Sequence, residues 1–288
     1  MSRKNAPVMT SSAAMQRTVL SHRAAGRKIG VVPTMGALHE GHLALIRRAR
    51  EMTDIVVTTI FVNPLQFGKS EDLSRYPRNL DRDVELAAGM GADIIFAPPE
   101  GEIYPVGYST FIEVAGVTEV LEGKSRPGHF KGVTTVVAKL FEITQPHLAV
   151  FGQKDAQQIV VVRKMLHDLN FPVELVVVPT VREPDGLALS SRNVFLTASQ
   201  RAEAPVLYRA LQLGEQLLLG GEHNCDTIRD AMRGLITSRS SGTIDYVSIA
   251  DGVTLREATN AQRGLPLLLS LAVRFGATRL IDNVPVVV

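Results

Sequence analysis

The stretch that most constrains how this chain can fold is residues 31–42, which read Val-Val-Pro-Thr-Met-Gly-Ala-Leu-His-Glu-Gly-His. An apolar β-branched run ends there in a turn that contains proline and glycine. His39 and His42 follow the turn, and residues 43–50 then repeat apolar side chains with a helical period. The pattern predicts a strand, a turn and a helix, with both histidines on the same face of the first helical turn.

A helix start of this kind is suited to binding an anion, because its first backbone N–H groups have no partner within the helix and its dipole is positive there. Gly41, between the histidines, would let a phosphate approach the backbone. Two imidazole donors would stabilise the charge that develops on an α-phosphate under attack. The spacing resembles the H-x-G-H signature of the nucleotidylyltransferase superfamily, which includes class I aminoacyl-tRNA synthetases.

Two other interpretations of the histidine pair are open. The pair could belong to a metal site, although the histidines of zincins are spaced four apart with a glutamate as base, and no third ligand is evident nearby. The histidines could also simply cap or line the start of a helix.

Composition excludes several classes of protein. Of the 288 residues, 45% are hydrophobic and 21% are charged, which is typical of a globular chain. The net charge of +2 gives no general signature of nucleic-acid or membrane binding. The single cysteine, Cys225, excludes an internal disulfide and suits a reducing compartment. No apolar run approaches the ~20 residues of a membrane helix, and no secretory signal is convincing. We therefore expect a cytoplasmic protein.

The first two thirds of the chain alternate strand-like and helix-like stretches, which predicts an α/β fold with a Rossmann-like parallel sheet. The predicted strands are 28–33, 55–61, 93–96, 148–151 and 173–178, and the predicted helices include 43–50, 80–90, 133–145 and 157–169. Ligands of such sheets bind outside the carboxyl ends of the strands. Polar clusters follow three of those ends, at 39–42, 63–66 and 152–155.

The pattern changes after Asn193. A helical stretch is expected at 197–219 and another at 227–238, followed by strands and turns at 243–250 and 265–275. We predict two domains: residues 1–185 as the Rossmann-like domain that carries the candidate site, and residues 186–288 as a smaller α+β domain.

Six stretches together resemble the pantothenate synthetases, or pantoate–β-alanine ligases, a family of the H-x-G-H superfamily. They are 33–42 (PTMGALHEGH), 60–67 (IFVNPLQF), 76–78 (YPR), 126–133 (RPGHFKGV), 151–158 (FGQKDAQQ) and 182–193 (REPDGLALSSRN). The resemblance covers nearly the whole chain. It implies that pantoate attacks the α-phosphate of ATP to form pantoyl adenylate and pyrophosphate, and that β-alanine then displaces AMP. It also implies that residues 1–185 form the catalytic domain that binds ATP and pantoate, and that residues 186–288 close over the site. Mg²⁺ with the ATP and a homodimer are implied as well.

Several polar residues suit this chemistry on their own terms. His39 and His42 fit the α-phosphate, and the family assigns the histidine matching His42 as proton donor. Lys154 is a mobile point charge suited to phosphate, although a lone lysine at such a position is more often simply solvated. Asp155 could hold ribose or magnesium, or cap a helix.

A hydroxyl-rich stretch, 190–192, resembles the family's counterpart of the K-M-S-K-S loop. Ser190, Ser191 and Arg192 would stabilise the leaving pyrophosphate, although the same residues occur in ordinary turns.

The resemblance also assigns whole binding surfaces. The residues implied for ATP are Met35, Gly36, Ala37, Leu38, His39, Glu40, Gly41, His42, Gly152, Gln153, Lys154, Asp155, Val181, Leu189, Ser190, Ser191 and Arg192. Those implied for pantoate are the amides Gln66 and Gln158, with Asn63 as an orienting group or turn starter, and an apolar wall of Phe61, Val133 and Val136. Without the resemblance, the three apolar residues would be interpreted as core. Arg126 and His129 lie in a Pro/Gly-containing loop and receive no definite role.

Three positions depart from the family pattern. Gln153 stands where the family usually has Glu, Ala156 where it usually has Tyr, and Leu189 where it often has Met. The change to Leu keeps the volume and should matter little. The other two put rate and affinity in doubt, but not the class of reaction.

Two rival functions are considered. A different H-x-G-H adenylyltransferase would need additional basic residues for a phosphorylated acceptor, whereas this pocket offers the uncharged Gln66 and Gln158. A nucleotide-binding regulatory module could keep the fold after losing activity through changes such as Gln153 and Ala156. Formation of AMP in the presence of both acids would distinguish these possibilities.

Overall fold

The structure is a computed structural model that describes residues 6–68, 73 and 76–288. It divides into two compact units, the first formed by residues 1–152 and 161–178 and the second by residues 153–160 and 179–288. The chain thus contributes a short segment after residue 152 to the second unit, and returns to that unit a few residues before the boundary predicted at 185/186. The functional roles predicted for the two domains stay predictions.

The first unit is built on a six-stranded parallel sheet in the order β1-β4-β3-β2-β5-β6. Its strands are β1 (Val8–Met9), β2 (Ile29–Thr34), β3 (Ile55–Ile60), β4 (Ile94–Phe96), β5 (Leu148–Gly152) and β6 (Glu174–Val178). Its helices are α1 (Ser12–Ala24), α2 (Glu40–Met52), α3 (Leu80–Gly89), α4 (Glu100–Ile103), α5 (Leu121–Ser125), α6 (His129–Thr144) and most of α7 (Ala156–Asp168). The predicted Rossmann-like sheet is confirmed.

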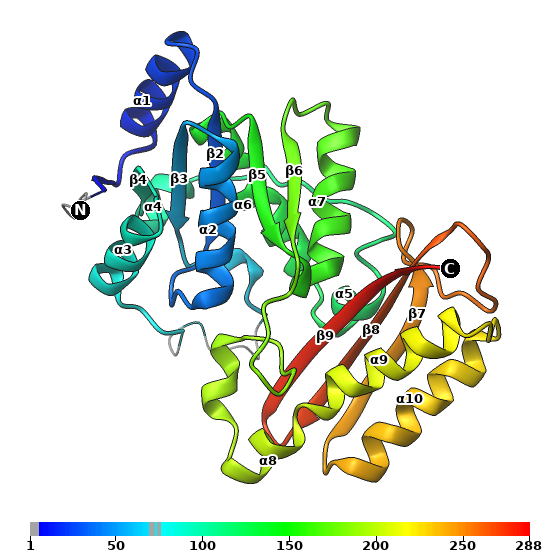
Figure 1. The fold of residues 1–288 in the computed structure, drawn as a ribbon. Helices are drawn as coiled ribbons and strands as arrows, with labels where there is room; N and C mark the ends of the chain where they lie inside the picture. The colour runs from blue at the N-terminus through cyan, green and yellow to red at the C-terminus, as the bar shows by residue number, and fades with distance from the viewer. Residues whose placement is uncertain (1–5, 69–72, 74–75) are drawn as a thin grey trace. The chain divides into compact units, whose positions relative to one another are not determined.

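Helices cover both faces of this sheet. Figure 1 shows α2 in front of the strands and α6 behind them. The apolar face of α2, which includes Leu43 and Ile46, forms one core with Val32, Val56 and Val150 of the strands. Because the strands are buried on both sides, they consist of continuous apolar runs, and this is what made them recognisable from the sequence.

The order of the strands reverses between β2 and β5. From β2 the chain first builds the sheet outward through β3 and β4, and later continues on the other side with β5 and β6. The pairing of β2 with β5 ends at Val31 and Ala149, although β2 continues to Thr34. Pro33, which has no N–H to donate, lies beyond that pairing. Ligands of open α/β sheets bind at such a switch point, and residues 35–39 begin there.

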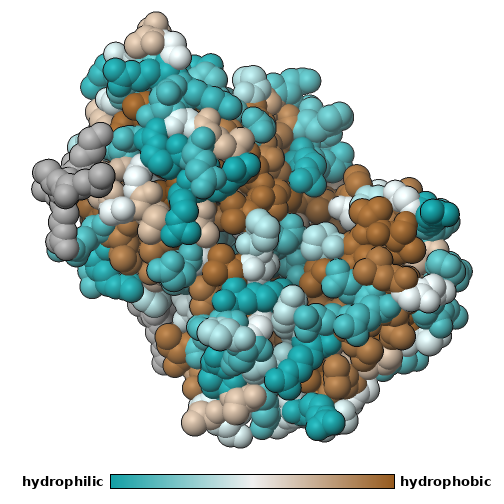
Figure 2. All heavy atoms as spheres, in the orientation of Figure 1, coloured by the Kyte–Doolittle hydropathy of each residue, from teal (hydrophilic) through white to brown (hydrophobic). Residues whose placement is uncertain are grey.

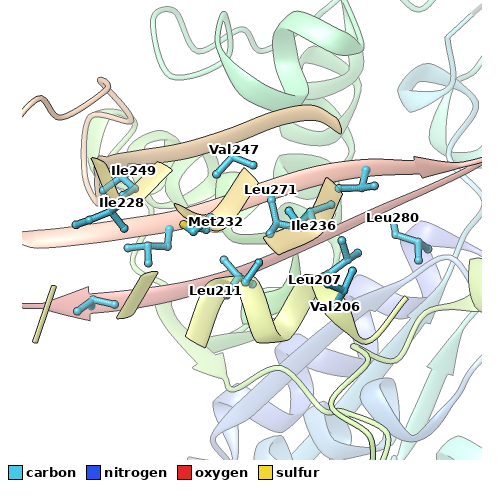
Figure 3. Packing of buried hydrophobic residues seen from close by; sticks show 14 of the residues in the cluster. Val206, Leu207, Leu211, Ile228, Met232, Ile236, Val247, Ile249, Leu271 and Leu280 are labelled. Atoms are coloured by element: carbon cyan, nitrogen blue, oxygen red, sulfur yellow. The ribbon is translucent and has the colours of Figure 1, made fainter. Parts of the chain in front are cut away.

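The second unit contains an antiparallel sheet of β7 (Thr243–Asp251), β8 (Pro266–Phe275) and β9 (Thr278–Val287). Its helices are α8 (Ala198–Glu203), α9 (Val206–Leu219) and α10 (Cys225–Arg239). Ile228, Met232 and Ile236 of α10 recur at helical spacing and pack with Leu211 and Leu271 in the core shown in Figure 3. The surface of α9 and α10 in Figure 2 is largely hydrophilic, with hydrophobic residues scattered over it. The smaller α+β part is confirmed.

One predicted helix is wrong in extent. The stretch 197–219 forms two helices, α8 and α9, separated at Ala204 and Pro205. Proline has no N–H for a bond within the helix and clashes with the preceding turn, so a new helix starts at Val206. No helix in the described part of the chain combines the length and the apolar composition that crossing a membrane requires.

Candidate active site

Both histidines of the 39–42 motif cap the start of α2. His39 is the N-cap residue, and its Nδ1 accepts the N–H of Gly41 at 3.2 Å. His42 reaches back, and its Nδ1 accepts the N–H of His39 at 3.4 Å. The two ring centroids lie 4.2 Å apart. The prediction that the histidines share one face is confirmed, and so is the interpretation that they cap the helix.

Capping also determines which ring nitrogen carries the proton. A neutral imidazole that accepts a hydrogen bond at Nδ1 has its proton on Nε2. His39 and His42 therefore both have Nε2 as their N–H donor. Capping and donation to a phosphate use different nitrogens, so the two interpretations that the sequence left open are compatible.

Glycine is needed at position 41 for a different reason from the one that the sequence suggested. A Cβ at this position would lie 2.9 Å from Cε1 and 3.0 Å from Nδ1 of the His39 ring. The N–H of Gly41 is bound by that ring, whereas the sequence suggested that it was exposed to let a phosphate approach. Glycine is required here because the His39 ring folds over the helix start.

We expect Gly41→Ala to lower the rate of the reaction about tenfold without stabilising the protein. Replacing glycine by alanine in a helix normally stabilises it by roughly 0.5–1 kcal/mol, but here the new methyl group must displace the His39 ring. Gly234→Ala is the matched control, because a Cβ there meets nothing within 4 Å and lies on the exposed side of α10. Thermal unfolding and turnover of both variants check this; a Gly41→Ala protein that is more stable and fully active would contradict it.

A buried carboxylate that the sequence reasoning missed holds the loop before His39. Asp83 of α3 is 1% exposed, and its two oxygens accept the N–H groups of Ala37 and Leu38, each at 2.8 Å. Gly36 has a φ of +82°, and a Cβ there would lie 2.9 Å from the Asp83 carboxylate. The backbone N–H groups of Ala37 and Leu38, included among the ATP-binding residues, are thus already bound by protein. The available signal was an aspartate four residues before the buried Ala87, on the apolar face of a helix.

The turn after β3 is organised by Asn63, which is 1% exposed. Its Oδ1 accepts the N–H of Leu65 at 3.3 Å and the hydroxyl of Tyr104 at 2.8 Å. Its Nδ2 donates to the Gly132 carbonyl and to Oε1 of Gln66, both at 3.1 Å. These four bonds use the Asn63 amide within the protein, and one of them orients Gln66. The predicted contact of Asn63 with substrate stays a prediction.

Gln66 is the amide that faces the loop preceding the histidines. Its Nε2 lies 2.8 Å from Sδ of Met35, so the structure brings two of the predicted site residues together. Its backbone carbonyl accepts a bond from Nδ1 of His129 at 2.8 Å. Arg126 contacts the same carbonyl through Nη2 at 3.5 Å and His129 Nε2 through Nη1 at 3.0 Å. These two residues had no role from the sequence.

The predicted apolar wall is buried. Phe61, Val133 and Val136 are 6%, 2% and 6% exposed. The ring of Tyr104 lies 6.1 Å from that of Phe61. Burial raises the pKa of Tyr104 well above its usual value, and the nearby Tyr108 and Glu100 add to the effect. The Tyr104 hydroxyl therefore stays protonated and remains a donor to Asn63.

In the second unit, the turn that carries Lys154 is fastened to β9 by Asn283. The Asn283 amide donates to the carbonyls of Gln153 at 3.0 Å and Lys154 at 2.9 Å, and it accepts the side-chain amide of Gln153 at 2.9 Å. Nζ of Lys154 lies 3.8 Å from Asp155. Gln153, which stands where the family usually has Glu, thus has Asn283 as its hydrogen-bond partner. Ala156 is buried, and Gln158, on α7, is half-buried.

Residues 190–192 follow a short hairpin in the same unit. Val181 and Leu189 pair through a bond of 2.9 Å, and Arg182 forms a two-pronged ion pair with the buried Asp282 at 2.6 and 3.0 Å. Ser190 caps the following turn by accepting the N–H of Arg192 at 3.2 Å, while the Arg192 side chain is exposed. The sequence left open that residues 190–192 form an ordinary turn, and the structure does contain that turn.

Comparison with known proteins identifies the family. Residues 7–285 match the family model described as pantoate-beta-alanine ligase. The chain belongs to this family. It is 55% identical to the pantothenate synthetase of Moorella thermoacetica over 277 residues, which cover 96% of this chain and 97% of the relative. The Roseiflexus sp. (strain RS-1) pantothenate synthetase is 54% identical over 278 residues, 96% of each chain.

Solved structures of the family share the fold. The pantothenate synthetase of Thermus thermophilus matches with a TM-score of 0.88 at 46% identity, covering 96% of this chain and 98% of that one. A pantoate-beta-alanine ligase from Francisella tularensis, in complex with Beta-gamma ATP and Beta-alanine, matches with a TM-score of 0.78 at 34% identity and 97% coverage of both chains. The fold and the ligase family expected from the sequence are both confirmed.

Proposed function

We propose that this ligase condenses pantoate with β-alanine in two steps, at the expense of ATP. In the first step a carboxylate oxygen of pantoate attacks the α-phosphorus, and the bond to pyrophosphate breaks. In the second, the amine of β-alanine attacks the carbonyl carbon of pantoyl adenylate, loses a proton and displaces AMP. The Francisella tularensis relative, bound to Beta-gamma ATP and Beta-alanine, supports ATP and β-alanine as substrates.

The observation that carries this proposal is the helix start of α2. His39 and His42 lie ring against ring, and each has its proton on Nε2 because Nδ1 is occupied by a backbone N–H. Two fixed donors beside the positive end of a helix dipole suit the charge that builds up on an α-phosphate. We assign both histidines to the adenylylation transition state.

Charge on the departing pyrophosphate is assigned to the second unit. Lys154 is a point cation whose backbone Asn283 holds in place. Ser190, Ser191 and the exposed Arg192 supply hydroxyls and a guanidinium, which binds phosphate oxygens in pairs. The hairpin that presents them is braced by the Arg182–Asp282 ion pair.

The pantoate site is assigned to uncharged groups. Gln66 and Gln158 would bind the hydroxyl and carboxylate, and the buried Phe61, Val133 and Val136 would contact the geminal methyl groups. Asn63 acts here through Gln66.

Magnesium is implied by the family. No group of three His, Cys, Asp or Glu side chains suited to hold a metal occurs among the residues that the structure describes. Magnesium that arrives with a nucleotide usually takes one or two protein carboxylates together with phosphates and water, so such a group is not required. The ion would neutralise phosphate charge, and its protein ligands are left unassigned. The homodimer, the cytoplasmic location and closure of the second domain also stay predictions.

The first step should be detectable alone. We expect the enzyme to exchange labelled pyrophosphate into ATP when pantoate is present and β-alanine is absent, because the adenylate forms before the amine is needed. Adding β-alanine should then yield pantothenate and AMP in equal amounts. Exchange that strictly requires β-alanine would contradict the free-standing adenylate.

The same assay distinguishes the rival functions. A different adenylyltransferase would form a nucleotide product with a phosphorylated acceptor and give no pantothenate. A regulatory module would bind ATP without exchange.

A further inference from the structure

Gln66 is held at both ends, which sets it apart from an ordinary surface amide. Asn63 binds its side chain, and His129 together with Arg126 binds its backbone carbonyl. The 3-10 turn that carries Gln66, Pro64–Gln66, is itself held weakly, since its backbone bonds measure 3.4 and 3.2 Å. Its position therefore depends on side chains from elsewhere in the first unit.

The direction of the amide follows from groups whose roles are unambiguous. A backbone N–H can only donate, so the Leu65 N–H identifies the Asn63 atom that it meets as the oxygen. A backbone carbonyl can only accept, so the Gly132 carbonyl identifies the other as the nitrogen. Asn63 therefore donates to Oε1 of Gln66, and Nε2 of Gln66 must point toward Met35.

The carbonyl end is determined in the same way. The Gln66 carbonyl can only accept, so Nδ1 of His129 carries a proton. Arginine has no acceptor, so Nε2 of His129 must accept from Nη1 of Arg126. Arg126 thus selects the tautomer of His129 that can hold Gln66. His129 is 9% exposed, which keeps water from replacing this bond.

Close packing prevents the turn from moving toward α6. A Cβ on Gly132 of α6 would lie 2.3 Å from the Leu65 carbonyl oxygen and 2.6 Å from the Gln66 nitrogen. The start of α6, which carries His129, therefore lies directly against the turn.

We propose that Arg126 and His129 are positioning residues for pantoate, acting as a relay in which Arg126 fixes the tautomer of His129 and His129 fixes the carbonyl of Gln66. This inference rests on the proposed role of Gln66 in binding pantoate. Neither residue needs to touch a substrate. A displacement of about 1 Å can cost a factor of 10² in rate. Because Gln66 is assigned to pantoate, loss of the relay should act specifically on pantoate.

The test compares three single variants with a matched control. His129→Leu removes the donor, while His129→Asn keeps an N–H close to the position of Nδ1. Arg126→Met keeps the length of the side chain but loses the guanidinium. Lys124→Ala removes an exposed cation from the preceding helix, α5, and should behave as wild type. We expect His129→Leu and Arg126→Met to lower kcat/KM for pantoate about 10- to 100-fold with little change in KM for ATP, and His129→Asn to retain most activity.

A double-mutant cycle with Gln66→Ala shows whether the relay acts through Gln66. Without the Gln66 side chain, positioning its backbone no longer matters, so His129→Leu should add less than threefold to the defect of Gln66→Ala. Additive losses, equal losses for ATP and pantoate, or no rescue by Asn would each overturn the relay. If His129→Leu does not fold, as judged by thermal unfolding, Arg126→Met completes the cycle. Failure of the wild-type enzyme to make pantothenate would instead refute the proposed function.

Discussion

Replacing His42 with Ala should slow single-turnover formation of pantoyl adenylate by about 10²–10³, the usual effect of losing one fixed donor to developing charge. It should also destabilise the protein by roughly 0.5–1 kcal/mol, the usual effect of losing a helix cap. Both losses are expected because His42 caps α2 with Nδ1, while its proton lies on Nε2.

His42→Glu separates the two roles. Glutamate three residues after the N-cap position is a standard partner in a capping box, because its carboxylate can accept the N–H of the N-cap residue, and it has no N–H to donate to a phosphate. The Glu variant should therefore recover the melting temperature of the wild type while adenylate formation stays slow. Rapid quench with labelled ATP measures the rate, and thermal unfolding measures the stability. If the Glu variant recovered both, His42 would serve only as a cap.

The features that the sequence predicted well depend on local spacing. His39 and His42 were placed on one face because helical geometry brings residues three apart together. The strands of the first unit were recognisable because buried parallel strands are continuously apolar. The polar clusters at 39–42 and 63–66 follow strand ends, and the bond between Gln66 and Met35 shows that the second cluster meets the loop that leads into the first.

The features that it missed depend on contacts between distant segments. Asp83 binds Ala37 and Leu38 across more than 40 positions of sequence, and His129 binds Gln66 across more than 60. Spacing within a helix or strand carries no information about such pairs. The prediction of one helix over 197–219 gave too little weight to Pro205, because alanine recurs before the proline and leucine recurs after it, and both residues favour helices.

One consequence is that the polar residues around this site divide into those that can face a ligand and those that hold the others. Asn63 and Asp83 are both 1% exposed, and their bonds are made to protein. His39 and His42 belong to both groups, because each ring has two nitrogens with different tasks. A residue-type pattern alone predicts the first group, whereas the second is recognised only from burial and partners.

Asp83→Ala should therefore be among the most damaging changes in the first unit, although Asp83 need not touch a substrate. It leaves the buried N–H of Leu38 and the half-buried N–H of Ala37 without their acceptor, which should cost about 2–4 kcal/mol of stability. Because these residues lead directly into His39, adenylate formation should also fall at least tenfold. Asp83→Asn keeps one acceptor oxygen, so its stability and rate should lie between those of Asp83→Ala and the wild type.

Asp81→Ala, on the exposed side of the same helix, is the control and should cost no more than roughly 0.3–1 kcal/mol of stability through the helix dipole. Thermal unfolding and single-turnover rates would measure both effects, and equal stability of the Asp83→Ala and Asp81→Ala proteins would show that the clamp does not hold the loop.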